Sequence, residues 1–115
     1  DVCVIKQVRF TDITTAGFVK YTINSFLAMK VVFFNELFHL FNKSAGLSFD
    51  SLTEIVSMDD RIGNSHLQVP GPDGDYGFGG ACFPKDTKAF VQFAKDSGPL
   101  ELLEHVIKLN NEIRN

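Results

Sequence analysis

The chain has 115 residues, of which 44% are hydrophobic, and 14 acidic against 11 basic residues give it a formal net charge of −3. This length suits one domain with a packed core but is short for a complete multidomain enzyme. The charges form no basic block, which argues against a nucleic-acid surface. No apolar stretch reaches the roughly 18 residues of a membrane span.

The first ten residues alternate valine and isoleucine with polar positions, as a strand does. One strand has no partner in an otherwise helical chain. We therefore interpret residues 1–11 as a remnant strand or linker from a preceding domain, and residues 12–115 as a helical domain. The first six residues lack the small-residue cleavage site of a signal peptide. Cys3 and Cys82 could pair, but free thiols in a reducing cytosol fit this chain better.

A long helix is predicted over residues 13–44, with N-cap candidates at 11–15, Gly17 as its one weak point and Gly46 as its end. At about 1.5 Å per residue it is roughly 45–50 Å long, whereas a compact domain of this size is only about 35 Å across. Between residues 26 and 41 apolar side chains occupy nearly every face, which indicates burial all round. We therefore expect a partner for this helix: a second copy, flanking domains, or both.

A short helix follows, with Ser51 and Glu54 spaced as a capping box and an end near Met58. Residues 60–81 hold six of the nine glycines and two of the four prolines, so they predict a long, functional loop. Pro84 is expected to begin a third helix that Gly98 ends, and residue 99 to begin a fourth. Their inward faces are predicted to carry Ala89, Phe90, Phe93 and Ala94, and then Leu102, Leu103, Val106, Ile107 and Leu109. The fold class is all-α: a long central helix packed with three or more shorter helices, plus a short N-terminal extended segment.

Residues 77–86 read GFGGACFPKD and place one cysteine where a glycine-rich loop becomes a helix. The positive end of the helix dipole and the charge of Lys85 would both lower the pKa of the Cys82 thiol. Such a thiolate is a nucleophile, and the glycines would let a ligand approach the backbone. Asp86 is expected in the first turn of the helix. The alternative is a tight turn that buries an inert cysteine.

Three ordered motifs bear on that choice. They are the cysteine segment, the sequence DRIG at residues 60–63, and KYTINSFLA at 20–28 followed by FNE at 34–36. Together they resemble the central domain of the UDP-glucose/GDP-mannose dehydrogenase family over residues 12–110. The resemblance implies that the parent protein is a cytoplasmic, NAD-dependent nucleotide-sugar 6-dehydrogenase, with Cys82 as the nucleophile of a four-electron oxidation.

The resemblance also implies roles for three polar residues. Lys20 and Asn24 are four apart on one helix face, where alone they read as a solvated polar stripe. In the family the matching pair lies against the reacting carbon and stabilises oxyanions. Asp86 would orient or deprotonate the hydrolytic water, beyond its favourable charge at the helix start.

Five further residues are expected at the substrate by the same resemblance. Arg61 would reach the nucleotide sugar across a dimer interface, where a guanidinium suits a diphosphate, although it also reads as a surface arginine. Phe78, Gly79 and Phe83 would line the sugar pocket, the phenylalanines being alternatively core residues. Lys85 either assists the thiolate or is an exposed lysine at the helix start.

Two other kinds of site are disfavoured. His39, His66 and His105 have no ligand spacing to another histidine or cysteine, so a hydrolase dyad or a metal site is not expected. The loop glycines fail the dinucleotide fingerprint, because its third glycine falls at Cys82 and no strand precedes the loop. NAD should therefore bind elsewhere, and the family resemblance implies a flanking Rossmann-type domain that this chain lacks.

The prediction is thus the central domain of a UDP-glucose 6-dehydrogenase type enzyme, which also forms the core of a homodimer through its long helix. The isolated chain is expected to be inactive. Alternatives are a GDP-mannose or UDP-N-acetylhexosamine 6-dehydrogenase, or a non-catalytic dimerisation module that would leave Cys82, Lys20 and Asn24 unexplained. Gly17 and the long loop at residues 70–75 depart from the family pattern.

Overall fold

The computed structural model describes residues 13–44 and 48–114. In this part of the chain there are four helices and no strand: α1 (Ile13–Asn42), α2 (Phe49–Val56), α3 (Cys82–Ala94) and α4 (Glu101–Arg114). The all-α prediction is confirmed, including the long helix with shorter helices packed on it. The predicted N-terminal extended segment and the helix end at Gly46 lie outside the described residues.

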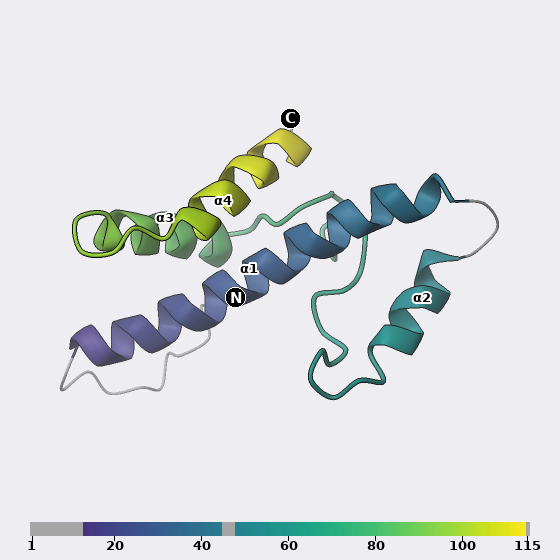
Figure 1. Cartoon of the computed structure of the whole chain (residues 1–115), viewed down its shortest axis with the longest axis horizontal. Coiled ribbons are helices and arrows are strands. Elements are labelled where there is room, and N and C mark those ends of the chain that lie inside the picture. The colour runs from purple at the N-terminus through teal and green to yellow at the C-terminus, as the bar shows by residue number, and fades with distance from the viewer. Residues whose placement is uncertain (1–12, 45–47, 115) are drawn as a thin grey trace.

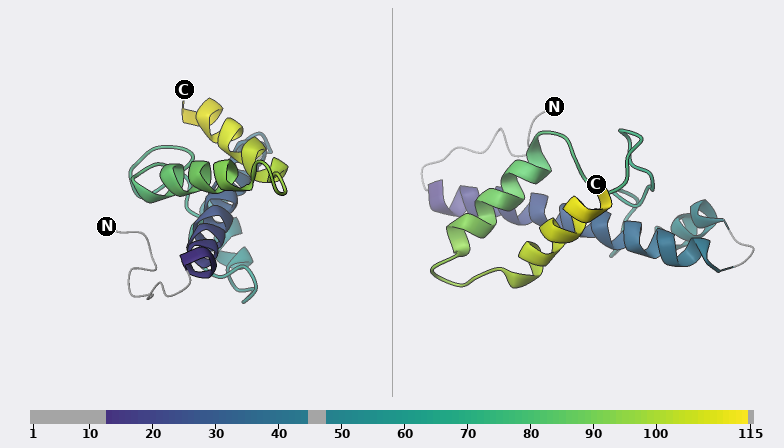
Figure 2. Two further views of the ribbon diagram at one scale, coloured as in Figure 1. Left: turned by 90° about the vertical axis from the view of Figure 1, so that its left-hand side faces the viewer. Right: turned by 90° about the horizontal axis from the view of Figure 1, so that it is seen from above.

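Helix α1 sets the shape of the molecule, as Figure 1 shows. Its 30 residues correspond to about 45 Å, and the longest dimension of the molecule is 52 Å against 27 and 24 Å in the other directions. Helices α3 and α4 lie on one side of α1, and α2 lies beside its C-terminal end (Figures 1 and 2). The molecule is therefore elongated along α1 and longer than the roughly 35 Å expected of a compact domain of this size.

Two apolar clusters hold the other helices against α1. Where α1, α3 and α4 meet, the buried residues are Ala28, Val32, Phe78, Phe90, Leu103 and Val106. Near the far end of α1, the buried residues are Phe34, Phe49, Leu67 and Val69, from α1, α2 and the long loop. The long loop thus contributes residues to both clusters. This packing holds the loop against α1 between the two clusters.

The structure corrects two predicted helix starts. Ser48, not Ser51, caps α2: its Oγ accepts a hydrogen bond from the Ser51 N–H at 3.4 Å. Helix α3 begins at Cys82 rather than at Pro84, so proline occupies the third position, where its missing N–H still costs no intrahelical bond. Asp86 is consequently the fifth residue of α3 and not part of its first turn.

Two predicted core positions are wrong. Leu102 is 64% exposed and Phe93 is 56% exposed, whereas their neighbours Leu103 and Phe90 are buried. Helix α1 is likewise not buried all round within this chain, since Phe26, Phe33 and Leu40 remain largely exposed. No helix in the described part combines the length and apolar character that a bilayer crossing requires.

Candidate functional site

Three of the predicted catalytic side chains meet where α1 crosses α3. Asn24 Nδ2 donates a hydrogen bond of 2.7 Å to Asp86 Oδ2. Lys20 Nζ lies 3.8 Å from the other carboxylate oxygen of Asp86. Because Lys20 and Asn24 are one turn apart on α1, both reach the same carboxylate from one helix face.

This cluster is buried, and burial strengthens the electrostatic interactions among its side chains. Asn24 is fully buried and Asp86 is 1% exposed, while the Lys20 side chain is 27% exposed. A buried carboxylate needs a counter-charge and hydrogen bonds, and the ammonium and the amide supply both. Asn24 Oδ1 is also buried, with no hydrogen-bond partner among the described groups.

Cys82 is the first residue of α3 and lies one turn before Asp86 on that helix. Positions four apart in a helix share a face, so the cysteine follows the same side of α3 as the buried carboxylate. The expectation of a free thiol is wrong here, because Cys82 is disulfide-bonded in this structure. The other cysteine, Cys3, lies outside the described residues.

Two asparagines that the sequence analysis gave no role fix the glycine-rich loop in front of α3. The Gly77 N–H donates to Asn35 Oδ1 at 2.9 Å. The Phe78 N–H donates to Asn110 Oδ1 at 2.7 Å, and Asn110 Nδ2 donates to the Phe78 carbonyl at 2.9 Å. Gly77 has a φ of +73°, and a Cβ there would overlap Asn110 Oδ1, so this position requires glycine.

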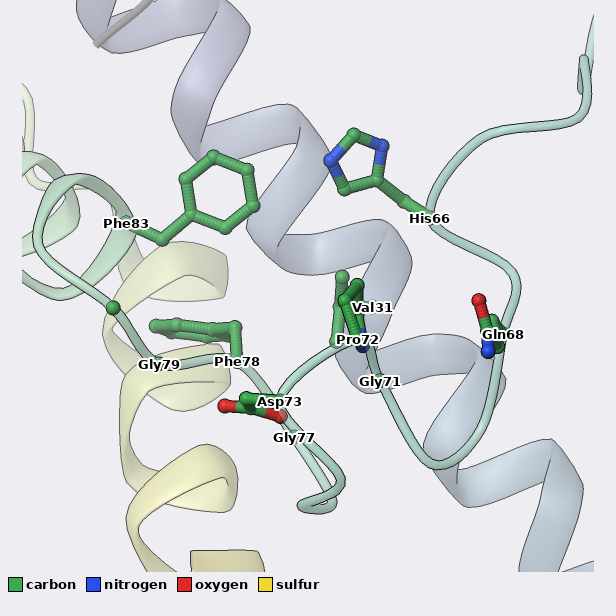
Figure 3. A pocket seen from close by; sticks show the side chains of 11 residues that line it. Val31, His66, Gln68, Gly71, Pro72, Asp73, Gly77, Phe78, Gly79 and Phe83 are labelled. Atoms are coloured by element: carbon green, nitrogen blue, oxygen red, sulfur yellow. The ribbon is translucent and has the colours of Figure 1, made fainter. Parts of the chain in front are cut away.

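A cavity of about 410 Å³ opens beside this loop (Figure 3). Phe78, Gly79 and Phe83, which were predicted to contact substrate, all line it. The opposite side is formed by the earlier part of the long loop, including His66 and Pro72. The cavity is therefore built almost entirely by residues 66–83, resting on α1.

His66 was not predicted to be at this cavity. Its ring lies 5.6 Å from the Phe83 ring, tilted by 33°, and Figure 3 shows the two side chains projecting toward each other. Burial and the nearby positive charge of Lys30 lower the pKa of His66. The neutral imidazole and the phenyl ring make this end of the cavity apolar and offer aromatic surfaces for stacking.

Arg61 and Lys85 do not line the cavity. Arg61 is exposed and pairs with Asp59, with Nη2 2.7 Å from Oδ2. It borders a separate apolar hollow of about 280 Å³ on α1, next to the exposed rings of Phe26 and Phe33. Lys85 is exposed on α3. The described residues contain no cluster of side chains able to hold a metal ion.

The supporting asparagines left a signal in the sequence. Asn35 interrupts the apolar run of α1, and Asn110 follows an apolar position on α4. An asparagine within such a pattern needs hydrogen-bond partners when buried. Neither sequence pattern predicts which groups are the partners, because they are backbone groups of a loop that lies 42 residues from Asn35 and 32 residues from Asn110 in the sequence.

Residues 14–112 match the family model described as "UDP-glucose/GDP-mannose dehydrogenase family, central domain". The chain belongs to this family. It is 38% identical over 105 residues to the UDP-glucose 6-dehydrogenase TuaD of Bacillus subtilis, a match over 90% of this chain and 22% of the relative. It is 42% identical over 107 residues to a UDP-glucose 6-dehydrogenase of Rickettsia bellii, over 92% of this chain and 23% of the relative.

A further relative, the UDP-glucose 6-dehydrogenase YwqF of Bacillus subtilis, is 41% identical over 102 residues, which are 88% of this chain and 22% of the relative. The chain thus spans less than a quarter of the length of the curated relatives it matches. The family match covers α1, the long loop and the start of α3, so the Lys20–Asn24–Asp86 cluster and the cavity both lie inside the central domain.

Proposed function

We propose that the parent protein is an NAD-dependent UDP-glucose 6-dehydrogenase and that this chain supplies its nucleophile and oxyanion-stabilising groups. One observation carries the proposal: Lys20 and Asn24 converge on Asp86, one helical turn from Cys82. Burying a carboxylate costs desolvation energy, so a cluster that buries Asp86 against Lys20 and Asn24, one turn from Cys82, favours a chemical role over a purely structural one. The relatives' names favour UDP-glucose over GDP-mannose as the substrate.

The proposed reaction converts the C6 hydroxyl of the sugar to a carboxylate in two oxidations. Loss of a hydride and a proton gives the aldehyde, and the Cys82 thiolate adds to its carbon to give the thiohemiacetal oxyanion. Loss of a second hydride gives a thioester. Water then adds to the thioester carbon, the C–S bond breaks, and the acid and the thiolate are released.

Lys20, Asn24 and Asp86 would act on the anionic intermediates of this reaction. The Lys20 ammonium and an Asn24 amide N–H would stabilise the alkoxide and the tetrahedral oxyanions, in a site where burial strengthens each interaction. Asp86 accepts a hydrogen bond from the Asn24 amide and lies 3.8 Å from the Lys20 ammonium, so it would orient both groups, and its carboxylate would act on the hydrolytic water.

The cysteine must be reduced for this chemistry, since a disulfide sulfur is not a thiolate. The disulfide at Cys82 therefore makes the proposed activity dependent on a thiol reductant, which would return two electrons and two protons to the pair. A cytoplasmic location, which we propose for the parent, would supply such a reducing environment.

The described residues do not fit NAD by themselves. They contain no strand, and the glycine-rich loop lacks the strand–loop–helix context that binds a dinucleotide pyrophosphate. A Rossmann-type domain elsewhere in the parent would hold the cofactor.

The same proposal includes a homodimer through α1. Phe26, Phe33 and Leu40 are spaced seven residues apart and are 61%, 60% and 64% exposed. Residues at this spacing follow one side of a helix, so they form a single apolar stripe that a second copy can cover. Arg61 borders the hollow beside this stripe, which supports its proposed reach toward the substrate of the partner subunit.

The full-length parent tests the chemistry in a single-turnover experiment with dithiothreitol present. Cys82→Ser should block release of the uronic acid while still allowing the first oxidation, because a serine hydroxyl stays protonated near neutral pH. Lys20→Ala should slow both oxidations by about 10²–10³. Lys88→Ala, an exposed lysine of α3, is the matched control and should leave both rates unchanged.

NADH formed per active site is counted, and the product is identified by mass spectrometry. A Cys82→Ser enzyme that made the uronic acid at a near-normal rate would remove the nucleophile role.

A further inference from the structure

Residues 70–75 form a closed turn within the long loop. The Gly74 N–H donates to the Gly71 carbonyl and the Gly71 N–H donates to the Asp75 carbonyl, both at 2.9 Å. Asp73 Oδ1 accepts from the Asp75 N–H at 3.0 Å. Gly71, Pro72 and Asp73 line the 410 Å³ cavity, so this turn is one of its walls.

Arg114, at the end of α4, ties this turn to the rest of the molecule. Its Nη2 donates to Asp73 Oδ2 at 2.9 Å, and its Nη1 lies 3.7 Å from Asp75 Oδ2. Both carboxylate oxygens of Asp73 are therefore engaged, one within the turn and one by the guanidinium. The hydrogen bond from Arg114 is the main cause that lowers the pKa of Asp73.

The same guanidinium covers Gly79 on the other wall of the cavity. A Cβ placed on Gly79 would lie 2.6–2.7 Å from the carbon and the terminal nitrogens of the Arg114 guanidinium. Arg114 therefore sits in the space that the missing side chain leaves. One side chain thus joins the turn at 70–75 to the glycine-rich segment that precedes Cys82.

We propose that Arg114 is a positioning residue that holds the turn at 70–75 as a wall of the substrate cavity and thereby limits the size of the sugar that the enzyme accepts. The inference rests on the proposed function, because it assumes that the cavity takes the sugar of a nucleotide sugar. Arg114 acts through Asp73, Asp75 and the backbone at Gly79 and needs no contact with substrate.

The contacts of Arg114 with Asp73 and Asp75 are expected to fix the position of the turn at 70–75 but to contribute little to the stability of the fold. The Asp73 and Asp75 side chains are 46% and 70% exposed, so solvent and salt screen their attraction to Arg114. Loss of the link should therefore free the turn while the buried contacts of Phe78 with Asn110 remain. The expected effect is on substrate fit and not on the chemical step.

The test uses the full-length parent with UDP-glucose and with UDP-N-acetylglucosamine, which carries a bulkier group on the sugar. Arg114→Met should raise KM for UDP-glucose by about fivefold, the factor that corresponds to one surface ion pair, and leave kcat unchanged. The preference for UDP-glucose in kcat/KM should fall by a similar factor, because a freed wall admits the larger sugar. Lys108→Met removes a positive charge from an exposed site on the same helix and should change neither value.

An Asp73→Asn, Asp75→Asn variant breaks the link from its exposed side and keeps the proposal testable if Arg114→Met fails to fold. It should reproduce the loss of preference, and combining it with Arg114→Met should add nothing further. An unchanged preference in both variants, or an equal change in Lys108→Met, would overturn the role of Arg114 while the proposed function stands. A wild-type parent that oxidises neither sugar would overturn both proposals.

Discussion

Asn110 shows how one amide can fix a loop backbone. Its side chain accepts from the Phe78 N–H and donates to the Phe78 carbonyl, so both polar groups of a buried residue are satisfied at once. A side-chain amide offers this donor and acceptor pair, whereas a carboxylate offers acceptors only. The position of the cavity-lining Phe78 therefore depends on the identity of this residue.

Replacement of Asn110 by aspartate should destabilise the full-length protein by about 2–3 kcal/mol, because the buried Phe78 carbonyl loses its donor and faces a carboxylate oxygen. Asn111→Asp is the matched control, since Asn111 is exposed on the same helix. Urea unfolding of both variants measures the difference. Equal stability of the two would show that the Asn110 clamp contributes nothing.

At the residue scale the sequence predicted which side chains share a helix face but not which groups they contact. The four-residue spacing of Lys20 and Asn24 places them on one face of α1, and in the structure both lie next to Asp86. That this neighbour is Asp86 follows only from how α3 packs on α1. The loop contacts of Asn35 and Asn110 depend on this packing too, so sequence spacing could not reveal them.

Among the elements, α1 presents two different faces, which neighbouring phenylalanines mark. Phe34 is 5% exposed and packs with Phe49, Leu67 and Val69, while Phe33 is 60% exposed. Adjacent helical positions are about 100° apart, so one ring serves this chain's own core and the other lies on the stripe with Phe26 and Leu40. The same aspartate substitution should therefore have different consequences at the two positions.

Phe33→Asp should convert the proposed dimer to a monomer that keeps its fold, because a charge buried in the stripe would oppose association. Phe34→Asp should instead cost several kcal/mol of folding free energy, since it places a carboxylate in the core. Phe93→Asp on α3 is the control, a similarly exposed phenylalanine outside the stripe, and should change neither property. Light scattering and thermal unfolding separate the outcomes, and a Phe33→Asp protein that stays dimeric would contradict the α1 interface.

The elements themselves were largely predictable. The bounds of α1 follow from its long apolar pattern, and α4 follows from its own periodicity after residue 99. The start of α3 was misplaced because Pro84 suits the first position of a helix, yet it is equally compatible with the third. Leu102 and Phe93 were wrongly placed inward because a small domain leaves some apolar positions of each helix uncovered.

At the scale of the whole molecule, the parts of the candidate site come from several elements. The cavity is formed by a loop that α1 and α4 hold in place, and the polar cluster lies between α1 and α3. The chain covers 22% of the length of its Bacillus relative TuaD, so a complete active site would draw groups from elsewhere in the parent. Under the proposed function, the central domain is expected to present the nucleophile and the pocket, and another domain is expected to hold the hydride acceptor.

The isolated 115-residue chain should therefore form no NADH from UDP-glucose and NAD, even with dithiothreitol present, while the full-length parent does so under the same conditions. The reason is the missing acceptor site, because its described residues offer no dinucleotide-binding unit.

Circular dichroism of the isolated chain must first show its helices, so that inactivity is not a failure to fold. Iodoacetamide labelling of Cys82 after reduction then shows that the nucleophile is accessible. NADH production by the folded chain alone would place the acceptor site within these residues and contradict the proposed division of labour.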